Sequence, residues 1–373
     1  MRRHRSTPRP GWQQTVESQG LLFHSIDNRT YWDESAYYAF SMAEVDALEE
    51  ATSALHAMCL RAVQHIIDDD RLEEFAVPPT HRDWVRRSWA QREPSLYGRF
   101  DFAYTGTGPP KLLEYNADTP TSLLEASVIQ WFWLQDLFPR GDQFNSIHEK
   151  LIDAWRELGP TTNGRVHFAA AGGSQEDFMT VTYLRETVHQ AGLAGDYLNV
   201  DQIGHDPVRG TFVDSQDRPI HTCFKLYPWE WMTREAFAGP LLSAWTRWIE
   251  PPWKMLLSNK ALLVVLWDLF PDSPYLLPAD YDPLPGDVVR KPALSREGAN
   301  VQITVGGRVL AETAGPYDGP VVYQAYAPLP RFDGNSPVIG SWIVNGHACG
   351  MGIREDSGPV TGNTSRFIPH VIA

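Results

Sequence analysis

The side chains best suited to chemistry alternate along two short segments: Arg99 and Asp101 lie on the first, and Glu114 and Asn116 on the second. Two carboxylates placed opposite each other repel and destabilise a strand pair, so a compensating charge is expected. Mg²⁺ would supply it, because this ion takes carboxylate and amide oxygens together with phosphate oxygens. The pattern therefore predicts metal ligation by Asp101, Glu114 and Asn116, and a neighbouring arginine that meets further anionic charge. The alternative is a local ion network in which Arg99 neutralises both carboxylates.

These side chains meet only if the two segments pair as a β-hairpin. Residues 97–104 alternate in polarity and are rich in aromatic side chains, and residues 111–116 read as the returning strand. A six-residue turn over 105–110 places Tyr104 opposite Lys111, and this register pairs the two acidic residues with each other and the arginine with the asparagine. Since residues i and i+2 share a strand face, all four polar groups project from one face. The opposite face carries apolar residues suited to a core: Phe100, Phe102, Leu113 and Tyr115.

The loop after the hairpin, residues 117–122, leads into a helical pattern of apolar residues. Free N–H groups at a helix N-terminus favour anions, so Thr119 and Thr121 are candidates for binding a substrate carboxylate or phosphate. The alternative is plain helix capping, because Ser122 and Glu125 have the spacing of a capping box.

Two lysines and a small-residue loop have the character of a phosphate site. Lys260 stands at the start of a predicted helix, and Lys291 ends a predicted strand before the loop 293–300, whose backbone N–H groups could close over phosphates. Residues 321–326 form an apolar strand interrupted by Gln324, which offers an edge to adenine or is ordinary sheet. Each lysine taken singly also fits a solvated surface position. The absence of GxxxxGK[ST] and GxGxxG disfavours P-loop and Rossmann sites.

Local signals predict the elements that carry these residues. A capping box at Ser41–Glu44 begins a long amphipathic helix over roughly 42–70. A strand at 165–171, a helix over 175–191 and a strand near 197–200 alternate, which favours an α/β unit. Beyond residue 286, short strands separated by glycine turns, the last over 338–347, predict a mostly antiparallel region. Further capping signals precede helices at Ser146–Glu149 and Ser258–Asn259.

Composition places the chain among ordinary globular proteins. Its 373 residues are 43% hydrophobic and 21% charged, which suffices for roughly two or three domains. A net charge of −14 without a basic stripe argues against a nucleic-acid partner, although it would suit a cationic substrate. The longest apolar run, Ala261–Trp267, is too short to span a bilayer, so no membrane association is expected. Three scattered cysteines and no secretory signal favour a reducing, cytoplasmic location.

These patterns divide the chain into four predicted parts. Residues 1–15 form a mobile basic tail, and residues 16–160 hold the long helix and the metal-binding hairpin. Residues 161–250 form an α/β substrate domain, and residues 251–373 form the nucleotide-binding lobe. No sequence feature indicates the oligomeric state.

Six segments resemble the glutathionylspermidine synthase family, and the resemblance extends over roughly 20–373. They are Tyr97–Phe102, Leu112–Ser122, Glu250–Lys260, Val289–Pro292, Ala348–Arg354 and Arg366–His370. The resemblance implies an α/β (α+β) fold, namely an ATP-grasp-like synthetase with a preceding α/β (pre-ATP-grasp) domain and a mostly antiparallel C-terminal lobe. It also implies an ATP-dependent ligase that joins a small-molecule or peptide carboxylate to a polyamine or another amine through an acyl phosphate.

The same resemblance implies roles for particular residues. Asp101, Glu114 and Asn116 would bind Mg²⁺. Arg99 and Arg354 match the family's arginines near the transferred phosphate, and Thr119, Thr121 and Glu176 fall where the family binds its peptide substrate. ATP contacts would come from Lys260, Lys291, Ser295, Gly298, Gln324, Ala325 and Tyr326.

Two departures limit what the resemblance implies. Bifunctional family members carry an N-terminal cysteine amidase domain that this sequence lacks, so we expect no hydrolysis of the conjugate. Residues 224–229 also differ from the family's substrate-side segment, which leaves the acid and the amine open. The alternative functions are a non-catalytic relative that binds nucleotide or peptide, and a metal-dependent hydrolase that uses Asp101 and Glu114.

Overall fold

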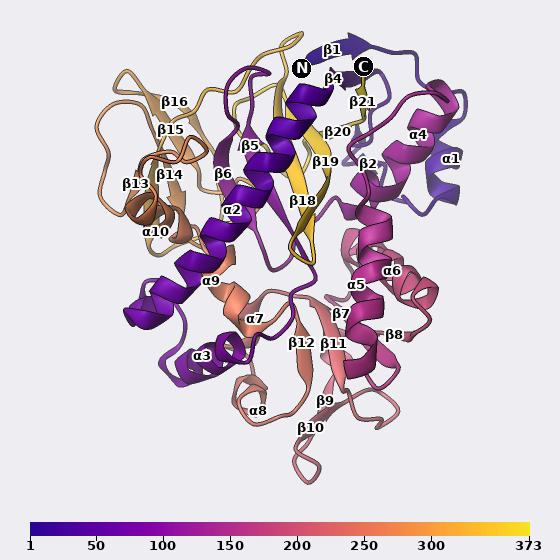
Figure 1. Cartoon of the computed structure of the whole chain (residues 1–373), viewed down its shortest axis with the longest axis vertical. Helices are drawn as coiled ribbons and strands as arrows, with labels where there is room; N and C mark the ends of the chain where they lie inside the picture. Colours follow the sequence, from indigo (N-terminus) through magenta and orange to yellow (C-terminus); the bar gives the residue numbers. More distant parts are fainter.

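Three sheets lie side by side in the computed structural model, which describes residues 1–373 (Figure 1). The central antiparallel sheet has the order β20-β19-β18-β5-β6. It consists of β5 (Tyr97–Ala103), β6 (Lys111–Asn116), β18 (Ser336–Val344), β19 (His347–Asp356) and β20 (Arg366–Ile368). The predicted hairpin therefore shares one sheet with strands more than 200 residues further along the chain. This joins the predicted N-terminal region to the predicted C-terminal lobe.

The hairpin forms with the predicted pairing at the four polar residues. Arg99 lies opposite Asn116, and Asp101 lies opposite Glu114. A β-bulge follows Asp101, so Lys111 faces Ala103 rather than Tyr104, and Leu113 does not join the apolar face. Leu112 is fully buried in its place, and the register predicted beyond the bulge was wrong because an extra residue shifts the alternation.

One long helix covers the apolar face of the central sheet. Ser41 and Glu44 form the predicted capping box, and α2 (Met42–Asp68) runs diagonally across β18 and β19 (Figure 1). A buried hydrogen bond of 2.6 Å joins the hydroxyls of Thr52 and Ser341 across this contact. Because α2 occupies this face, the alternate residues of the sheet face the opposite side, where the polar side chains of the hairpin gather.

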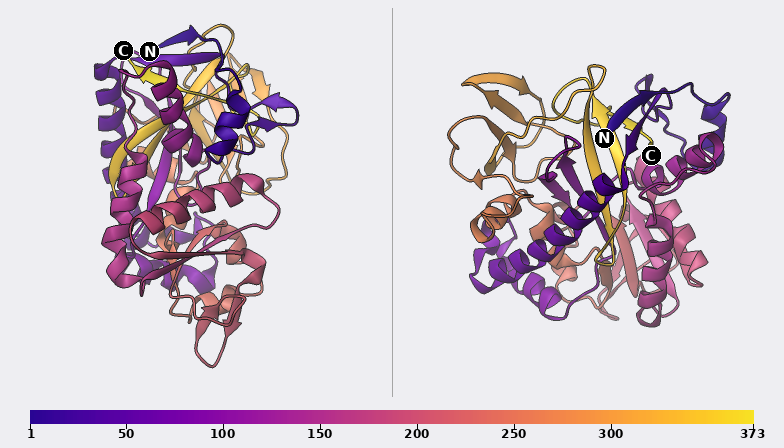
Figure 2. Two further views of the ribbon diagram at one scale, coloured as in Figure 1. Left: turned by 90° about the vertical axis from the view of Figure 1, so that its right-hand side faces the viewer. Right: turned by 45° about the horizontal axis from the view of Figure 1, so that its top comes forward.

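The predicted α/β unit is present as a parallel sheet of order β12-β11-β7-β8. Its strands are β7 (Arg165–Ala170), β8 (Ala194–Asn199), β11 (Thr222–Leu226) and β12 (Arg247–Ile249). Helix α6 (Gln175–Gln190) packs on β7 and β8, and α5 (Ile147–Leu158) packs on α6 (Figures 1 and 2). The hairpin of β9 (Gly204–Asp206) and β10 (Thr211–Val213) extends from the far end.

The third sheet is antiparallel, as predicted for the C-terminal region, with the order β13-β17-β14-β15-β16. Its strands are β13 (Ala279–Asp280), β14 (Val288–Pro292), β15 (Gln302–Val305), β16 (Arg308–Glu312) and β17 (Val321–Ala325). Helix α10 (Leu262–Leu269) packs on β13 and β17. The remaining helices are α1 (Trp12–Ser18), α3 (Arg82–Ala90), α4 (Gln130–Leu137), α7 (Trp229–Met232), α8 (Ala238–Leu241) and α9 (Met255–Ser258). No helix combines the length and the apolar character that crossing a membrane requires.

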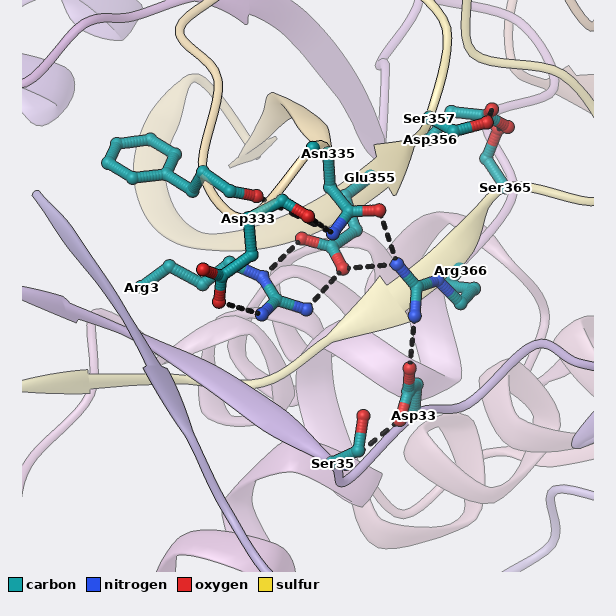
Figure 3. Close-up of polar contacts among 12 residues, drawn as sticks. Arg3, Asp33, Ser35, Asp333, Asn335, Glu355, Asp356, Ser357, Ser365 and Arg366 are labelled. Atoms are coloured by element: carbon teal, nitrogen blue, oxygen red, sulfur yellow. Dashed lines mark hydrogen bonds and ion pairs between the residues drawn. The ribbon is translucent and has the colours of Figure 1, made fainter.

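The basic N-terminal segment is an ordered strand, which differs from the mobile tail expected from the sequence. Strands β1 (Arg2–Arg5) and β21 (His370–Ile372) flank β4 (Ala36–Phe40), and the two chain ends lie next to each other (Figure 2). The guanidinium groups of Arg3 and Arg366 converge on the fully buried Glu355, at 2.8 and 2.7 Å (Figure 3). These arginines neutralise a buried carboxylate, so the segment is held by charge as well as by the strand pairing. A short hairpin, β2 (Ser25–Ile26) and β3 (Arg29–Thr30), lies nearby.

Candidate active site

The four polar residues of the hairpin form one connected group. Arg99 donates from Nε to Asp101 Oδ1 at 2.7 Å and from Nη2 to Asp101 Oδ2 at 2.9 Å. The Asn116 side chain contacts Asp101 Oδ2 at 3.1 Å and Glu114 Oε1 at 3.2 Å. The predicted convergence of Asp101, Glu114 and Asn116 is therefore present, and Arg99 neutralises Asp101 as the alternative of an ion network requires.

The donor set suits a hard divalent cation. The amide nitrogen of Asn116 faces two carboxylates that are already paired with cationic side chains. Rotation of the amide by 180° would place its oxygen in the same position. Two carboxylates and one amide oxygen on adjacent strands are ligands that Mg²⁺ takes together with phosphate oxygens. The residues present therefore fit this ion.

Two lysines from the third sheet's side of the molecule supply positive charge to the hairpin. Lys260 Nζ lies 3.2 Å from Glu114 Oε2, and Lys291 Nζ donates to the carbonyl of Leu113 at 3.0 Å. Burial alone would raise the pKa of the Glu114 carboxyl, but the charges of Lys260 and Lys291 lower it to about 2. Burial lowers the pKa of Lys291 to about 8. Glu114 is therefore ionised at neutral pH and available as a ligand.

A single cleft between the central and third sheets contains all seven residues predicted to contact ATP. Asp101 and Glu114 lie on its wall. The seven are Lys260, Lys291, Ser295, Gly298, Gln324, Ala325 and Tyr326. Val289, Val301 and Ile303 add an apolar side. The cleft thus combines an apolar surface with two lysines.

Gln324, which interrupts the predicted apolar strand, links the third sheet to the hairpin. Its amide oxygen accepts from Lys291 Nζ at 2.7 Å, and its amide nitrogen donates to the carbonyl of Leu112 at 2.9 Å. The carbonyls of Leu112 and Leu113 are available there because of the bulge in the hairpin. Through these contacts the bulge connects β6 to Lys291 and Gln324 of the third sheet.

A second hollow, on the same face of the central sheet, brings Arg99 and Arg354 together. Arg354 comes from β19, and one of its terminal nitrogens donates to the carbonyl of Gly362, whereas its Nε is buried without a partner. The two predicted phosphate-contacting arginines therefore meet beside Asp101. An unpaired buried donor of this kind favours an anionic ligand.

The predicted capping box of Ser122 and Glu125 does not form. Ser122 has a positive φ of 66°, and its hydroxyl and the Glu125 carboxylate both bind the Tyr31 hydroxyl, at 2.9 and 2.6 Å. Residues Glu125–Ile129 form a π-helical turn before α4. The helix was predicted correctly, but its first side chains are committed to a tertiary contact. At Ser146 likewise, the hydroxyl binds the carbonyl of Cys349 rather than the helix start.

Glu176, a predicted substrate residue, begins α6 near Glu125 and Arg354. Burial and the Glu125 carboxylate raise the pKa of Glu176 to about 7, against an ordinary value of 4.5. The native protein therefore binds a proton there that the unfolded chain has released between pH 4.5 and 7, and wild-type stability falls as the pH rises through this range.

Glu176→Gln removes this dependence. We expect the variant to gain about 1–3 kcal/mol of unfolding free energy over the wild type between pH 4.5 and pH 8. Urea denaturation of both proteins at the two pH values measures it. An equal difference at both pH values would contradict the assigned environment of Glu176.

The structure places the two predicted substrate threonines differently. The backbone carbonyl of Thr121 accepts from Arg99 Nη1 at 2.6 Å. The hydroxyl of Thr119 accepts from Arg296 Nη1 at 2.6 Å, and Arg296 also pairs with Glu230 at 2.5 Å. Sequence reasoning missed Arg296, although the loop 293–300 that carries it was identified; its signal was one arginine in a loop of small residues. Through Arg296 this loop reaches across to the loop 117–122.

A buried ion pair that sequence reasoning also missed fixes the loop 117–122. Lys225 Nζ pairs with Asp118, and neither side chain is more than 1% exposed. Asp118 Oδ2 also accepts from the backbone N–H of Trp229 at 3.0 Å. Lys225 lies in the segment 224–229, which differs from the family's pattern, and this was its only signal. The pair ties the loop to β11 and to the start of α7.

Lys225→Met is expected to lower the unfolding free energy by about 3–5 kcal/mol, because it leaves the Asp118 charge buried and unpaired. The double variant Asp118→Asn/Lys225→Met removes both charges and is expected to recover most of this loss. Urea denaturation at pH 7 measures both. Equal losses in the single and double variants would show that the charge pair is not the cause.

Metal-ligating groups also gather on the parallel sheet, where ligand atoms of His167, Asp196 and Asp214 lie within 4.8 Å of one another. Arg218 donates to Asp214 at 2.7 Å and to Asp196 at 2.8 Å. The guanidinium group of Arg218 therefore occupies the position that a metal ion would take. The hairpin is the better candidate for a metal site because its two carboxylates face a cleft.

A cleft between two antiparallel sheets, lined by lysines and carboxylates, is the arrangement expected of an ATP-grasp-type fold. The fold is similar to that of a glutathione synthetase-like effector from Globodera pallida, solved in its apo form. That similarity has a TM-score of 0.60 at 11% sequence identity and covers 99% of this chain and 100% of the other. The predicted fold class is therefore confirmed.

The family model described as "Glutathionylspermidine synthase preATP-grasp" matches residues 3–373, and the chain belongs to this family. It is 43% identical, over 97% of both chains, to a Haemophilus influenzae protein named "Putative acid--amine ligase". It is 32% identical to a trypanothione synthetase of Crithidia fasciculata, over 84% of this chain and 53% of the relative. It is 28% identical to a bifunctional glutathionylspermidine synthetase/amidase of Escherichia coli, over 91% of this chain and 60% of the relative.

The expected class, an ATP-dependent carbon–nitrogen ligase, is confirmed by these relationships. The chain spans little more than half the length of the trypanothione and glutathionylspermidine synthetases that it matches, and nearly the whole of the Haemophilus protein.

Proposed function

We propose that this protein joins a carboxylic acid to an amine through an acyl phosphate, with Mg²⁺ held by Asp101, Glu114 and Asn116. The observation that carries the proposal is the connected hairpin face. The Asn116 amide lies 3.1 Å from Asp101 Oδ2 and 3.2 Å from Glu114 Oε1, and both carboxylates line the cleft. A carboxylate is a poor electrophile, and phosphorylation gives it a leaving group.

The residues of the cleft have different roles in phosphoryl transfer, a reaction that depends on positioning and charge neutralisation. Lys260 and Lys291 bind phosphate oxygens of ATP, and Gln324 orients Lys291 through the 2.7 Å hydrogen bond. Asp101, Glu114 and Asn116 would hold Mg²⁺, which would supply charge neutralisation at the phosphates of ATP. Arg99 and Arg354 face the phosphoryl group as it moves toward the substrate carboxylate.

The acid and the amine approach from the side of the loop 117–122. Thr119 and Arg296 lie there, in a cavity that shares Glu114 and Lys260 with the nucleotide cleft. Glu176, beside Arg354, has a pKa raised to about 7, so its carboxyl can take up or release a proton near neutral pH, which suits contact with an amine. A peptide or small carboxylic acid and a polyamine or other amine are the substrate classes that we propose. The loop 293–300, through Arg296, excludes water from the acyl phosphate.

A condensation screen tests this function. The protein is incubated with MgATP, pooled acids and pooled amines, and condensed products are identified by mass spectrometry together with ADP release. With an acid labelled by ¹⁸O in its carboxylate, one labelled oxygen is expected in the released phosphate, because the acyl phosphate loses that oxygen to phosphate. Amide formation that releases unlabelled phosphate would contradict the acyl phosphate. Product formation without ATP would favour the hydrolase instead.

A further inference from the structure

Arg99 reaches its position over a glycine. Gly340 of β18 lies opposite Asp101 of β5 and shows the same face as the hairpin's polar residues. A Cβ atom at Gly340 would lie 2.8 Å from Arg99 Cδ, 3.2 Å from Nε and 3.3 Å from Cγ. Approaches below 3.0 Å do not occur between real atoms of this kind, so the stem of Arg99 occupies the space that any side chain at residue 340 would need.

The stem of Arg99 has no room to give way. Its guanidinium is held at both ends of the Asp101 carboxylate and by the carbonyl of Thr121 at 2.6 Å, and it lies over the ring of Trp342 at 5.8 Å. The clash would fall on the middle of the side chain, so relieving it would move the guanidinium and Asp101 with it. The side chain is 7% exposed, which leaves no solvent into which the stem could swing.

The position of Arg99 across Gly340 matters because of the N–H donors that its guanidinium still has to offer. The guanidinium has five N–H donors, three of which are committed to Asp101 and Thr121. The other two belong to the terminal nitrogens on the wall of the hollow shared with Arg354. We propose that Gly340 is a positioning residue for the ligase reaction: the absence of its side chain lets Arg99 lie across β18 and present two donors to the γ-phosphoryl group of ATP. This inference rests on the proposed function.

Gly350 of β19 provides a matched control. A Cβ atom there would lie 2.7 Å from Ile147 Cγ1, a contact as close as the one at Gly340, but with a side chain outside the cleft and the hollow. Neither glycine has a positive φ, so alanine is compatible with both backbones. The methyl group at residue 350 would press on Ile147 and, at 3.2 Å, on the carbonyl of Phe144 rather than on Arg99.

The test compares the affinities of Mg-AMP-PNP, which retains a γ-phosphoryl group, and MgADP, which lacks one, by isothermal titration calorimetry. We expect the wild type and Gly350→Ala to prefer Mg-AMP-PNP by the same factor. Gly340→Ala is expected to lower this preference about ten-fold, as Arg99→Ala does, while leaving the affinity for MgADP within about two-fold of the wild type. In Gly340→Ala/Arg99→Ala the preference is expected to equal that of Arg99→Ala alone, because the added methyl group then meets no stem.

Several outcomes would overturn the inference. A Gly340→Ala variant that keeps the wild-type preference for Mg-AMP-PNP over MgADP would do so. An equally large loss of this preference when Gly340→Ala is added to Arg99→Ala would also do so. If Gly340→Ala alone fails to fold, the double variant is expected to regain a cooperative unfolding transition, and a double variant that is equally unstable would count against the inference. A wild type that binds neither nucleotide would instead overturn the proposed function, and the inference with it.

Discussion

Glu114→Gln is expected to lower the kcat of ATP-dependent amide formation by about 10³-fold or more. The substitution keeps the shape of the side chain and removes the charge of the proposed metal ligand, which also lies 3.2 Å from Lys260. Metal coordination at a transferring phosphoryl group contributes several kcal/mol of charge stabilisation, and each 1.4 kcal/mol is a factor of ten in rate. ADP release and product formation, followed together at saturating MgATP, measure the effect.

Glu312→Gln is the control for this variant. Glu312 is exposed at the end of β16, on the third sheet but outside the cleft, and its carboxylate contacts only the side chain of Gln302. We expect wild-type kcat and stability for this variant. Turnover by Glu114→Gln at the control's rate would show that the hairpin is not the metal-binding face.

Arg354→Ala is expected to lower kcat by about 10³-fold while changing the KM for MgATP by less than about three-fold. Arg354 lies with Arg99 in the hollow beside Asp101, which the lysines proposed to bind the nucleotide do not line. An arginine that meets the moving phosphoryl group stabilises charge in the transition state more than in the bound nucleotide, and contributions of 10³ or more are known for such residues. Steady-state kinetics with ADP release separate kcat from KM.

The exposed Arg308 of β16 is the matched control, and Arg308→Ala is expected to behave as the wild type. A large rise in KM for Arg354→Ala at unchanged kcat would place Arg354 in nucleotide binding rather than in the phosphoryl-transfer step.

The hairpin and its polar face could be derived from the sequence because strand alternation and a short turn fix the register between neighbours in the chain. That argument gave the pairs Asp101–Glu114 and Arg99–Asn116. It missed the bulge, since nothing in residues 97–116 marks an extra residue. The turn at Asn345–Gly346, with φ values of 46° and 80°, was marked by an Asn-Gly signal. That signal was overlooked, and one strand was predicted across the turn that separates β18 from β19.

Contacts between distant segments lay beyond the sequence argument. The pairing of β5 with β18 joins residues more than 200 apart. It brings Gly340 to the hairpin and, through the pairing of β18 with β19, Arg354 as well. The Lys225–Asp118 pair and the anchoring of Arg3 by Glu355 depend on the same long-range packing. Local patterns give the type of an element, whereas the partner of a buried charge is set only when the sheets assemble.

The central claim is that Asp101, Glu114 and Asn116 together hold a divalent cation beside the nucleotide. Its most direct test is a titration of Mn²⁺, followed by electron paramagnetic resonance, into protein saturated with AMP-PNP. Tight binding of Mn²⁺ by the wild type and Glu312→Gln, weakened at least ten-fold in both Asp101→Asn and Glu114→Gln, is the predicted result. Equal Mn²⁺ affinity in all four proteins would contradict the account.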